Sequence, residues 1–330
     1  MMLLRCVVML FLATAAATAV TAEIPSGGAL AGDRPRVLIS TDIGGSDPDD
    51  VQSMVHLLVY ADVLDIEGLV STCPNFAGRV EHIDAVLKAY AVDRQALVRA
   101  SDRYPTVEAL RAGVRQGAIA AQSATEPSAP TPGALLIVER AKANDPRPLY
   151  VLAWGALTDV AAALHHDPAI APRLRLISVG AWNTSQDQLA RAYVDQCVPH
   201  LWWIESDTTF RGMYLGGKQD GDQGDRSFPL AHVASHGALG AAFMAAKPEI
   251  KMGDTPTLLY LLRGAPEDPT GPHWGGAFVR PDPTGRPTWW HDVTEPAQAE
   301  GKYPGARTVN RWRESFLADW RARMERCTAP

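Results

Sequence analysis

Apolar and polar positions follow two alternating periods along the chain from residue 34 onward. Residues 36–41 form a short β-branched run typical of a buried strand, and residues 48–61 repeat apolar side chains every three or four positions, as an amphipathic helix does. The pattern predicts strands at 36–41, 66–71, 97–100, 149–153, 174–180 and 201–205, and helices at 48–61, 79–91, 133–143 and 156–165. A last apolar stripe predicts one more helix at 308–327.

Strands separated by helices of this size predict crossover connections and a mainly parallel sheet with helices on both faces. We therefore expect a single α/β domain over residues 34–327, because no repeat or change in composition marks a boundary within it. Two segments depart from the alternation. One is a proline-rich loop at 123–132, and the other, at 264–304, combines prolines and glycines with tryptophans and histidines. Long irregular segments of the second kind often carry or cover a site.

The first 22 residues have the features of a secretory signal. Arg5 precedes an apolar stretch at 7–17, and small residues at 20–22 precede Glu23. The apolar stretch is about half as long as the roughly 20 residues that a membrane span needs. We therefore expect cleavage near Ala22, a linker at 23–33, and a secreted or periplasmic protein without a stable membrane anchor.

Composition narrows the class of partner. The chain has 330 residues, with 31 lysines and arginines against 37 aspartates and glutamates, and a net charge of −6. Affinity for nucleic acid rests on basic side chains, and here acidic ones are in excess, so we expect no nucleic-acid partner. We predict a small-molecule ligand instead, and homo-oligomerisation remains possible. Cys73, Cys197 and Cys327 follow the signal, and so small and odd a set indicates no disulfide framework, although it leaves room for one bridge.

The strongest chemical signal is an acidic loop directly after the first predicted strand. Asp42, Asp47, Asp49 and Asp50 lie within nine residues, between a strand and a helix. The carboxyl ends of parallel strands are where such sheets bind ligands, and clustered carboxylates repel one another unless a cation neutralises them. Oxygen ligands without cysteine or histidine favour calcium or magnesium. A structural alternative covers three of the four, with Asp47 as the helix N-cap and Asp49 and Asp50 beside the positive helix end.

The sequence TDIGGSDPDD at residues 41–50 resembles the N-terminal signature of the inosine-uridine nucleoside hydrolase superfamily. Residues 151–159 (VLAWGALTD) and 251–259 (KMGDTPTLL) are similar to two further segments of that family. Six residues separate Asp42 from Asp49, and Ser40 stands where the best-known hydrolases carry an aspartate. Both features match the divergent, secreted bacterial branch of the superfamily, and the resemblance covers about residues 34–327.

The resemblance implies a calcium ion held by Asp42, Asp50, Asp254 and the backbone carbonyl of Trp154. It also implies hydrolysis of an N-glycosidic bond, as in a ribonucleoside, by a metal-bound water with Asp42 as the general base. Asp49 would help to orient the sugar. Calcium is therefore the expected cofactor, and a sugar or nucleoside the expected substrate.

Five further residues are candidates for substrate contacts. Asn183, Glu205 and Asp207 end or follow predicted strands. His273 and Trp274 lie in the irregular segment, where an aromatic face could stack on the ligand and a histidine could protonate the leaving group. Each has a structural alternative, such as an asparagine that stabilises its own turn or a tryptophan in the core.

The main alternative function is that of a non-catalytic, calcium-dependent carbohydrate-binding or accessory protein on the same scaffold. Asp42 favours the enzyme, because a protein that only binds has less need of a general base. A haloacid-dehalogenase-like phosphatase with Asp42 as nucleophile is disfavoured, since Gly44 stands where such an enzyme would carry its second aspartate.

Overall fold

The computed structural model describes residues 34–45, 47–74, 78–121 and 130–328. The predicted signal at 1–22, the linker at 23–33 and most of the proline-rich loop at 123–132 lie outside the described residues. The strands are β1 (Arg36–Thr41), β2 (Asp65–Ser71), β3 (Val114–Gln116), β4 (Leu149–Ala153), β5 (Leu174–Val179), β6 (Trp202–Ser206), β7 (Phe278–Val279) and β8 (Trp289–Asp292).

All eight strands form one sheet in the order β3-β2-β1-β4-β5-β6-β8-β7. Every neighbouring pair is parallel except β7 with β8, which is antiparallel. The helices are α1 (Asp49–Val59), α2 (Val80–Ala100), α3 (Val107–Ala112), α4 (Pro132–Ala141), α5 (Thr158–His166), α6 (Trp182–Gln186), α7 (Gln188–Cys197), α8 (Ser227–His232), α9 (Gly237–Ala246), α10 (Thr255–Leu262), α11 (Arg307–Asn310) and α12 (Arg313–Glu325). Short 3₁₀ helices are η1 (Pro168–Arg173), η2 (Thr209–Met213), η3 (Gly221–Gln223), η4 (Pro296–Gln298) and η5 (Arg326–Thr328).

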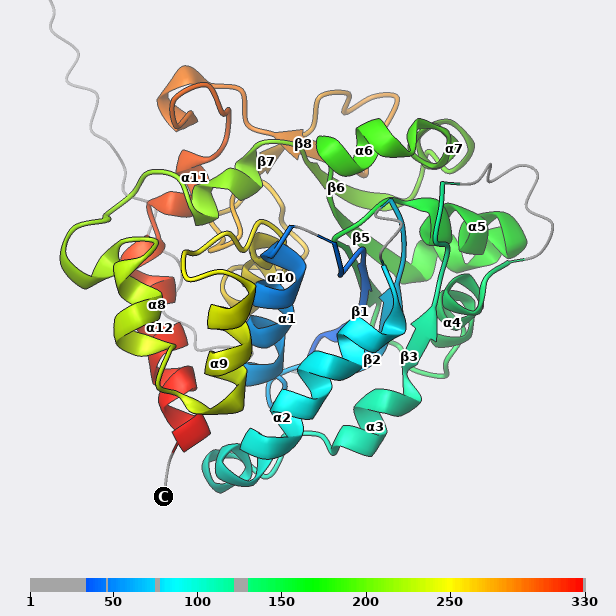
Figure 1. The fold of residues 1–330 in the computed structure, drawn as a ribbon. Coiled ribbons are helices and arrows are strands. Elements are labelled where there is room, and N and C mark those ends of the chain that lie inside the picture. Colours follow the sequence, from blue (N-terminus) through cyan, green and yellow to red (C-terminus); the bar gives the residue numbers. More distant parts are fainter. Residues whose placement is uncertain (1–33, 46, 75–77, 122–129, 329–330) are drawn as a thin grey trace, which may run out of the picture.

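Helices cover both faces of the sheet (Figure 1), and each face has its own apolar core. Helices α1, α2, α9, α10 and α12 pack on one face, and α4, α5 and α7 on the other. Successive strand residues point to opposite faces, so Val37 and Ile39 of β1 enter the first core while Leu38 enters the second. This double burial explains the continuous apolar runs, and it confirms the predicted α/β class.

The predicted strand at 97–100 is wrong, because these residues form the last turn of α2. Tyr90, Asp93 and Leu97 are all buried, at intervals of three and four residues, which is the period of a helix. The run Leu-Val was too short to distinguish a strand from the end of a long helix. The predicted helix at 308–327 is divided into α11 and α12, and Phe316, Trp320 and Met324 of α12 are buried as its stripe predicted.

The segment at 264–304 contains two strands that its composition did not predict. Strand β8 pairs in parallel with β6, and β7 pairs with β8, so this segment extends the sheet. Trp290 of β8 packs against Trp202 of β6 with 5.0 Å between ring centres. These tryptophans therefore belong to the sheet and its covering, and long-range pairing decided a structure that local sequence did not indicate.

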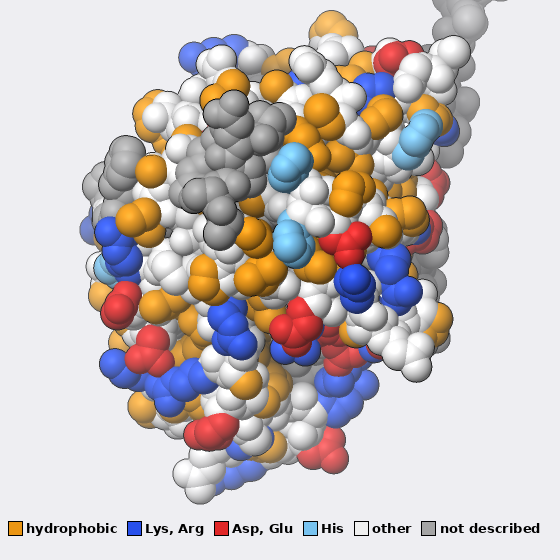
Figure 2. Space-filling model, turned by 90° about the vertical axis from the view of Figure 1, so that its right-hand side faces the viewer, with side chains coloured by type: hydrophobic (Ala, Val, Ile, Leu, Met, Phe, Trp, Pro, Cys, Tyr) orange, Lys and Arg blue, Asp and Glu red, His pale blue; other side chains and the backbone are white. Residues whose placement is uncertain are grey.

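The side of the molecule seen in Figure 2 carries interspersed acidic and basic side chains. The helices of the described residues include no apolar stretch of the length that a membrane span requires. Among the described residues, Cys73, Cys197 and Cys327 are unpaired, with only Cys197 exposed.

Candidate functional site

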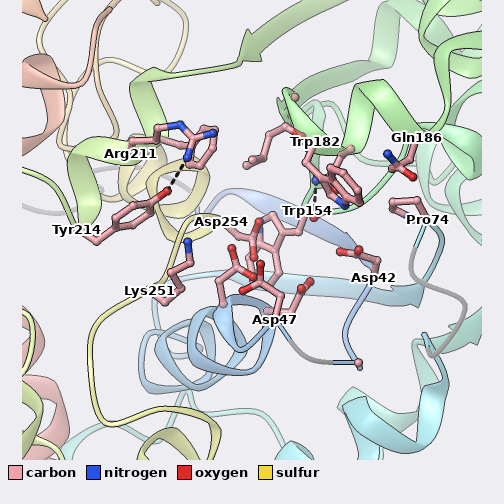
Figure 3. A pocket seen from close by; sticks show the side chains of 17 residues that line it. Asp42, Asp47, Pro74, Trp154, Trp182, Gln186, Arg211, Tyr214, Lys251 and Asp254 are labelled. Carbon is pink, nitrogen blue, oxygen red and sulfur yellow. Dashed lines mark hydrogen bonds between the residues drawn. The ribbon is translucent and has the colours of Figure 1, made fainter. Parts of the chain in front are cut away.

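A cavity of about 750 Å³ opens at the carboxyl ends of β1, β4, β5 and β6. Strand β1 lies between β2 and β4, and from β1 the chain builds the sheet first toward β3 and then, starting at β4, in the opposite direction. Such a switch in strand order leaves a crevice where open parallel sheets bind ligands. The cavity lies at this point, and Asp42, Asp47, Asp49, Asp50 and Asp254 line it (Figure 3).

Three of the aspartates form a compact cluster. Carboxylate oxygens of Asp49 and Asp50, at the start of α1, and of Asp254, before α10, lie within 4.8 Å of one another. Asp254 occupies the N-cap position of α10, yet its side chain accepts no capping hydrogen bond, and its Oδ2 is buried without a hydrogen-bond partner in the described part of the chain. Asp47 is not the N-cap of α1, because Pro48 takes that position. The structural alternative therefore fails for Asp47, and helix capping does not account for the Asp254 carboxylate either.

Burial and mutual repulsion make the cluster costly to ionise. Burial raises the pKa of Asp49 to about 8, and Asp47 and Asp42 add to that shift. Burial also raises the pKa of Asp50 and of Asp254 well above the usual range, and neighbouring carboxylates raise both further. A bound cation would remove this penalty. The buried, unpartnered oxygen of Asp254 and an all-oxygen donor set fit a hard divalent ion.

Gln52 of α1 brings the two halves of the cluster together. Its side-chain amide donates to the carbonyls of Lys247 and Glu249 at 3.0 and 2.8 Å, and its Oε1 accepts from the amides of Lys251 and Met252 at 2.8 and 3.3 Å. This fully buried side chain thereby fixes the loop before α10 against α1. The Thr41 hydroxyl donates to Asp50 and orients that carboxylate.

Asp42 lines the same cavity but lies outside the three-carboxylate cluster. In Figure 3 its carboxylate points into the cavity from the side away from Lys251. Gly155 allows this approach, because a Cβ there would lie 3.0 Å from the Cβ of Asp42 and 2.6 Å from the Cys73 carbonyl oxygen. The family resemblance implies four metal ligands, of which Asp50 and Asp254 meet in the cluster, while Asp42 and Trp154, whose carbonyl is the fourth ligand, line the same cavity outside it. Asp49, which the resemblance assigns to the sugar, also belongs to the cluster.

Trp154 and Asn183 also line the cavity. The Asn183 side-chain amide donates to the Trp154 carbonyl at 3.0 Å and to the Val179 carbonyl at 3.2 Å. The indole of Trp154 donates to Thr257 Oγ1 at 2.8 Å, which ties the end of β4 to α10. A carbonyl oxygen has two lone pairs, so the Trp154 carbonyl retains capacity to bind an ion.

Four predicted substrate contacts do not line the cavity. Glu205 is buried and accepts from Arg191, at 3.0 and 2.8 Å. His273 is 0% exposed, with each ring nitrogen against a backbone carbonyl, and Trp274 is buried beneath Arg263. Asp207 accepts from the Ala181 amide at 2.7 Å and supports a turn beside the cavity. In this structure these four side chains contact other groups of the protein. Their positions in the sequence, at strand ends and in a tryptophan-rich segment, did not indicate this.

The turn that Asp207 supports presents an aromatic face that sequence reasoning missed. Ala181 has φ of 51°, a conformation that costs energy for a residue with a side chain, and Trp182 follows it at the start of α6. Trp182 lines the cavity and is 67% exposed. An exposed tryptophan held by a strained turn next to a cavity is a recognisable binding feature, but its exposure is visible only in the folded structure.

Comparison with known proteins gives a family. The model described as "Cellulose-binding Sde182, nucleoside hydrolase-like domain" matches residues 36–278. The chain belongs to this family. The expected membership of a divergent branch of the nucleoside hydrolase superfamily is thereby confirmed. No curated protein matches the chain.

Solved structures share the fold. A nucleoside hydrolase-related protein from Saccharophagus degradans, described as associated with carbohydrate metabolism, is 24% identical, with 89% of this chain and 72% of that chain covered and a TM-score of 0.70. The plant nucleoside hydrolase PpNRh1 is 17% identical, with 90% and 99% covered and a TM-score of 0.50. The type III effector XopQ, solved with adenosine diphosphate ribose, is 12% identical, with 90% and 95% covered and a TM-score of 0.54. At these identities the similarity establishes the nucleoside-hydrolase-like fold.

Proposed function

We propose that the cavity binds a sugar ligand with the help of a calcium ion held by the aspartate cluster. The observation that carries this proposal is the buried, unpartnered Oδ2 of Asp254, within a group of three carboxylates at the inner end of a large cavity. Hard oxygen donors select calcium or magnesium, and calcium tolerates irregular geometry and mixed carboxylate and carbonyl ligands.

Asp49, Asp50 and Asp254 would hold the ion, with the Trp154 carbonyl and Asp42 as further oxygen donors that line the same cavity. The bound ion would neutralise the cluster and coordinate hydroxyl groups of the sugar. Asn183 restrains the Trp154 carbonyl by its hydrogen bond.

The aromatic surroundings support a carbohydrate ligand. Trp182 offers an exposed ring face at the cavity, and Gln186 on the same short helix offers an amide. Apolar ring faces pack against the C–H faces of sugars, and amides exchange hydrogen bonds with their hydroxyls. The family's description as cellulose-binding, and that of the Saccharophagus degradans protein as associated with carbohydrate metabolism, point to the same ligand class.

Hydrolysis of an N-glycosidic bond, as in a ribonucleoside, is the second candidate. It is favoured by the position of Asp42, whose carboxylate points into the cavity without belonging to the three-carboxylate cluster. A carboxylate in that position can accept a proton from an attacking water held beside the sugar, which is the role of a general base. His273 does not reach this cavity, so it offers no acid for the leaving group there.

One set of assays separates the two candidates. Purified protein is titrated with calcium and then with cello-oligosaccharides and ribose by calorimetry, and the release of free ribose from inosine and uridine is followed in parallel. Binding of sugar that needs calcium, without release of ribose, supports the binding protein. Release of ribose from inosine or uridine by the native protein supports the hydrolase, and a loss of that release in Asp42→Asn that exceeds any loss of sugar binding assigns the general base to Asp42. Neither binding nor release, with calcium bound, contradicts the proposed function.

We also propose export with cleavage after Ala22. Expression in a bacterial host with its native N-terminus, followed by mass spectrometry of the purified protein, tests this. A mature chain that begins at Glu23 is expected, and an intact Met1 would contradict it.

A further inference from the structure

Two cationic side chains line one wall of the cavity. Arg211 belongs to η2, and Lys251 lies in the loop before α10. In Figure 3 both lie on one side of Asp254 and Asp47, and Trp182 and Gln186 lie on the other side, together with Asp42. The cavity thus has an acidic base between a cationic wall and an aromatic wall.

Aromatic rings contact both cations, and neither forms an ion pair with a carboxylate of the described residues. The guanidinium carbon of Arg211 lies 4.8 Å from the ring centre of Phe210 and 4.7 Å from that of Tyr303. Its Nη1 donates to the Tyr214 hydroxyl at 3.1 Å, and the Nζ of Lys251 lies 4.6 Å from the centre of the Tyr214 ring. Such contacts position a cation without neutralising its charge.

Arg211 is incompletely satisfied by the protein. Its Nε is buried and has no hydrogen-bond partner among the described residues. A guanidinium carries five N–H donors in a planar fork that matches a carboxylate or a phosphate. The Tyr214 hydroxyl is the one hydrogen-bond partner of this guanidinium among the described residues, so N–H donors of Arg211 remain available to a ligand in the cavity that it lines.

Three other buried or half-buried arginines show a different arrangement, in which a carboxylate neutralises the guanidinium. Arg36 pairs with Glu67, Arg191 with Glu205, and Arg313 with Asp225. Acidic residues outnumber basic ones in this chain, at 37 to 31, so partners are not scarce. The cavity itself is lined by five aspartates, and yet Arg211 contacts rings and a phenol instead.

Arg211 and Lys251 have an alternative role, which is to offset the negative charge of the aspartates in the cavity. Lys251 does act on Asp49, because it opposes the rise in the pKa of that carboxyl. A divalent ion in the cluster would supply this charge balance itself. Arg211 and Lys251 would then still present two positive charges to the cavity, where a concave site concentrates the attraction for an anion.

We propose that the ligand is a sugar with an anionic group, a carboxylate or a phosphate, and that Arg211 and Lys251 bind that group. This proposal rests on the sugar-binding function proposed above and narrows its ligand to sugar acids and sugar phosphates. The sugar hydroxyls would face the aspartate cluster, and the anionic group would face the cationic wall.

The test compares matched neutral and anionic sugars on the calcium-loaded protein. Calorimetry measures glucose against glucuronic acid, and ribose against ribose 5-phosphate, at low and at high salt. We expect the anionic member of at least one pair to bind about tenfold more tightly, the value of one charge-assisted hydrogen bond, and the difference to shrink with salt. The pair that shows the larger difference identifies carboxylate or phosphate as the recognised group.

Variants assign the preference to the two residues. Arg211→Gln and Lys251→Gln are each expected to reduce the anionic preference, and the double variant to abolish it, while neutral sugars bind as before. Arg211→Lys keeps the charge and loses the planar fork, so an intermediate preference is expected. Lys218→Gln, at an exposed lysine outside the cavity, is the matched control. If Arg211→Gln fails to fold, Lys251→Gln alone must still reduce the preference.

The outcomes distinguish this inference from the function on which it rests. Equal binding of neutral and anionic sugars, or a preference that survives in the double variant with native melting behaviour, overturns the anionic ligand and leaves sugar binding intact. Failure of every sugar to bind the calcium-loaded protein overturns both. An anionic preference that disappears in the double variant supports the proposal.

Discussion

Replacement of Asp254 by asparagine should have opposite effects with and without calcium. Without the ion, three carboxylates lie within 4.8 Å of one another, and two full charges at that distance repel by about 3.5 kcal/mol at an effective dielectric constant of roughly 20. The raised pKa values of Asp49, Asp50 and Asp254 mean that the apo cluster retains protons, so only part of this repulsion is realised. We therefore expect calcium-free Asp254→Asn to be more stable than the native protein by ~1–3 kcal/mol.

The effect of calcium should be lost in the same variant. An ion present at about 100 times its dissociation constant stabilises the native protein by about 2.7 kcal/mol. Asparagine offers a neutral oxygen in place of a carboxylate, so at the same calcium concentration the gain should fall to near zero. For a domain of this size, these energies correspond to a melting temperature roughly 2–6 °C above that of the calcium-free native protein, both for the calcium-free variant and for the native protein with calcium.

Differential scanning calorimetry after treatment with chelator, and again after addition of calcium, measures both effects. Asp102→Asn, at an exposed aspartate outside the cavity, is the control and should change neither. A calcium-free Asp254→Asn protein that melts lower than the native one, yet gains as much from calcium, would refute the metal-binding role of this carboxylate. It would also leave the unpartnered Oδ2 without a function.

Three other predictions use different parts of the structure. Trp182→Ala should weaken sugar binding about tenfold in calorimetry, or ~1.4 kcal/mol, without lowering the melting temperature, because the ring is 67% exposed; an unchanged affinity would remove Trp182 from the site. Gln52→Leu deletes four hydrogen bonds of a buried amide, so urea unfolding should show a loss of ~2–4 kcal/mol and calcium titration a weaker affinity; a protein with native calcium affinity would contradict its positioning role. Burial, with the positive charge of Arg323, lowers the pKa of His56 to about 3. The neutral buried imidazole therefore contributes fully to stability above pH ~6.5, the pKa of histidine in the unfolded chain. As the pH falls from there toward 3, the free energy of unfolding decreases by ~1.4 kcal/mol per pH unit. Urea unfolding at neutral pH and at about pH 4.5 should therefore show a smaller acid-induced loss in His56→Phe, and equal losses would count against this assignment.

Local periodicity was sufficient for most of the sheet. The strands at 36–41, 149–153 and 174–179 were predicted because parallel strands buried on both faces need continuous apolar runs, which a sequence displays directly. Strand β8 was not predicted, since Trp289 to Asp292 become a strand only through their pairing with β6, more than 80 residues earlier in the chain. The false strand at 97–100 has a related cause, because a short apolar run fits the end of a helix equally well.

The candidate site was predictable to the extent that its residues follow strands or precede helices. Asp42, Asp49, Asp50 and Asn183 were named from such positions, Trp154 and Asp254 were named from the family resemblance, and all six line one cavity. Glu205 and Asp207 occupy equivalent positions but are engaged by protein groups. A strand end places a side chain near the edge of the sheet, whereas its rotamer and its neighbours decide whether it faces the cavity.

The sequence by itself determined the fold class and the acidic character of the site, because both arise from residues close together in the chain. Tertiary structure decided which carboxylates meet. Gln52 fixes the segment that carries Asp254 against α1 through hydrogen bonds that span about 200 residues. The tertiary structure also decided that Arg211 and Lys251, in the same cavity, pack against aromatic rings. Such contacts depend on packing between distant elements, and packing leaves no periodic signal in the sequence.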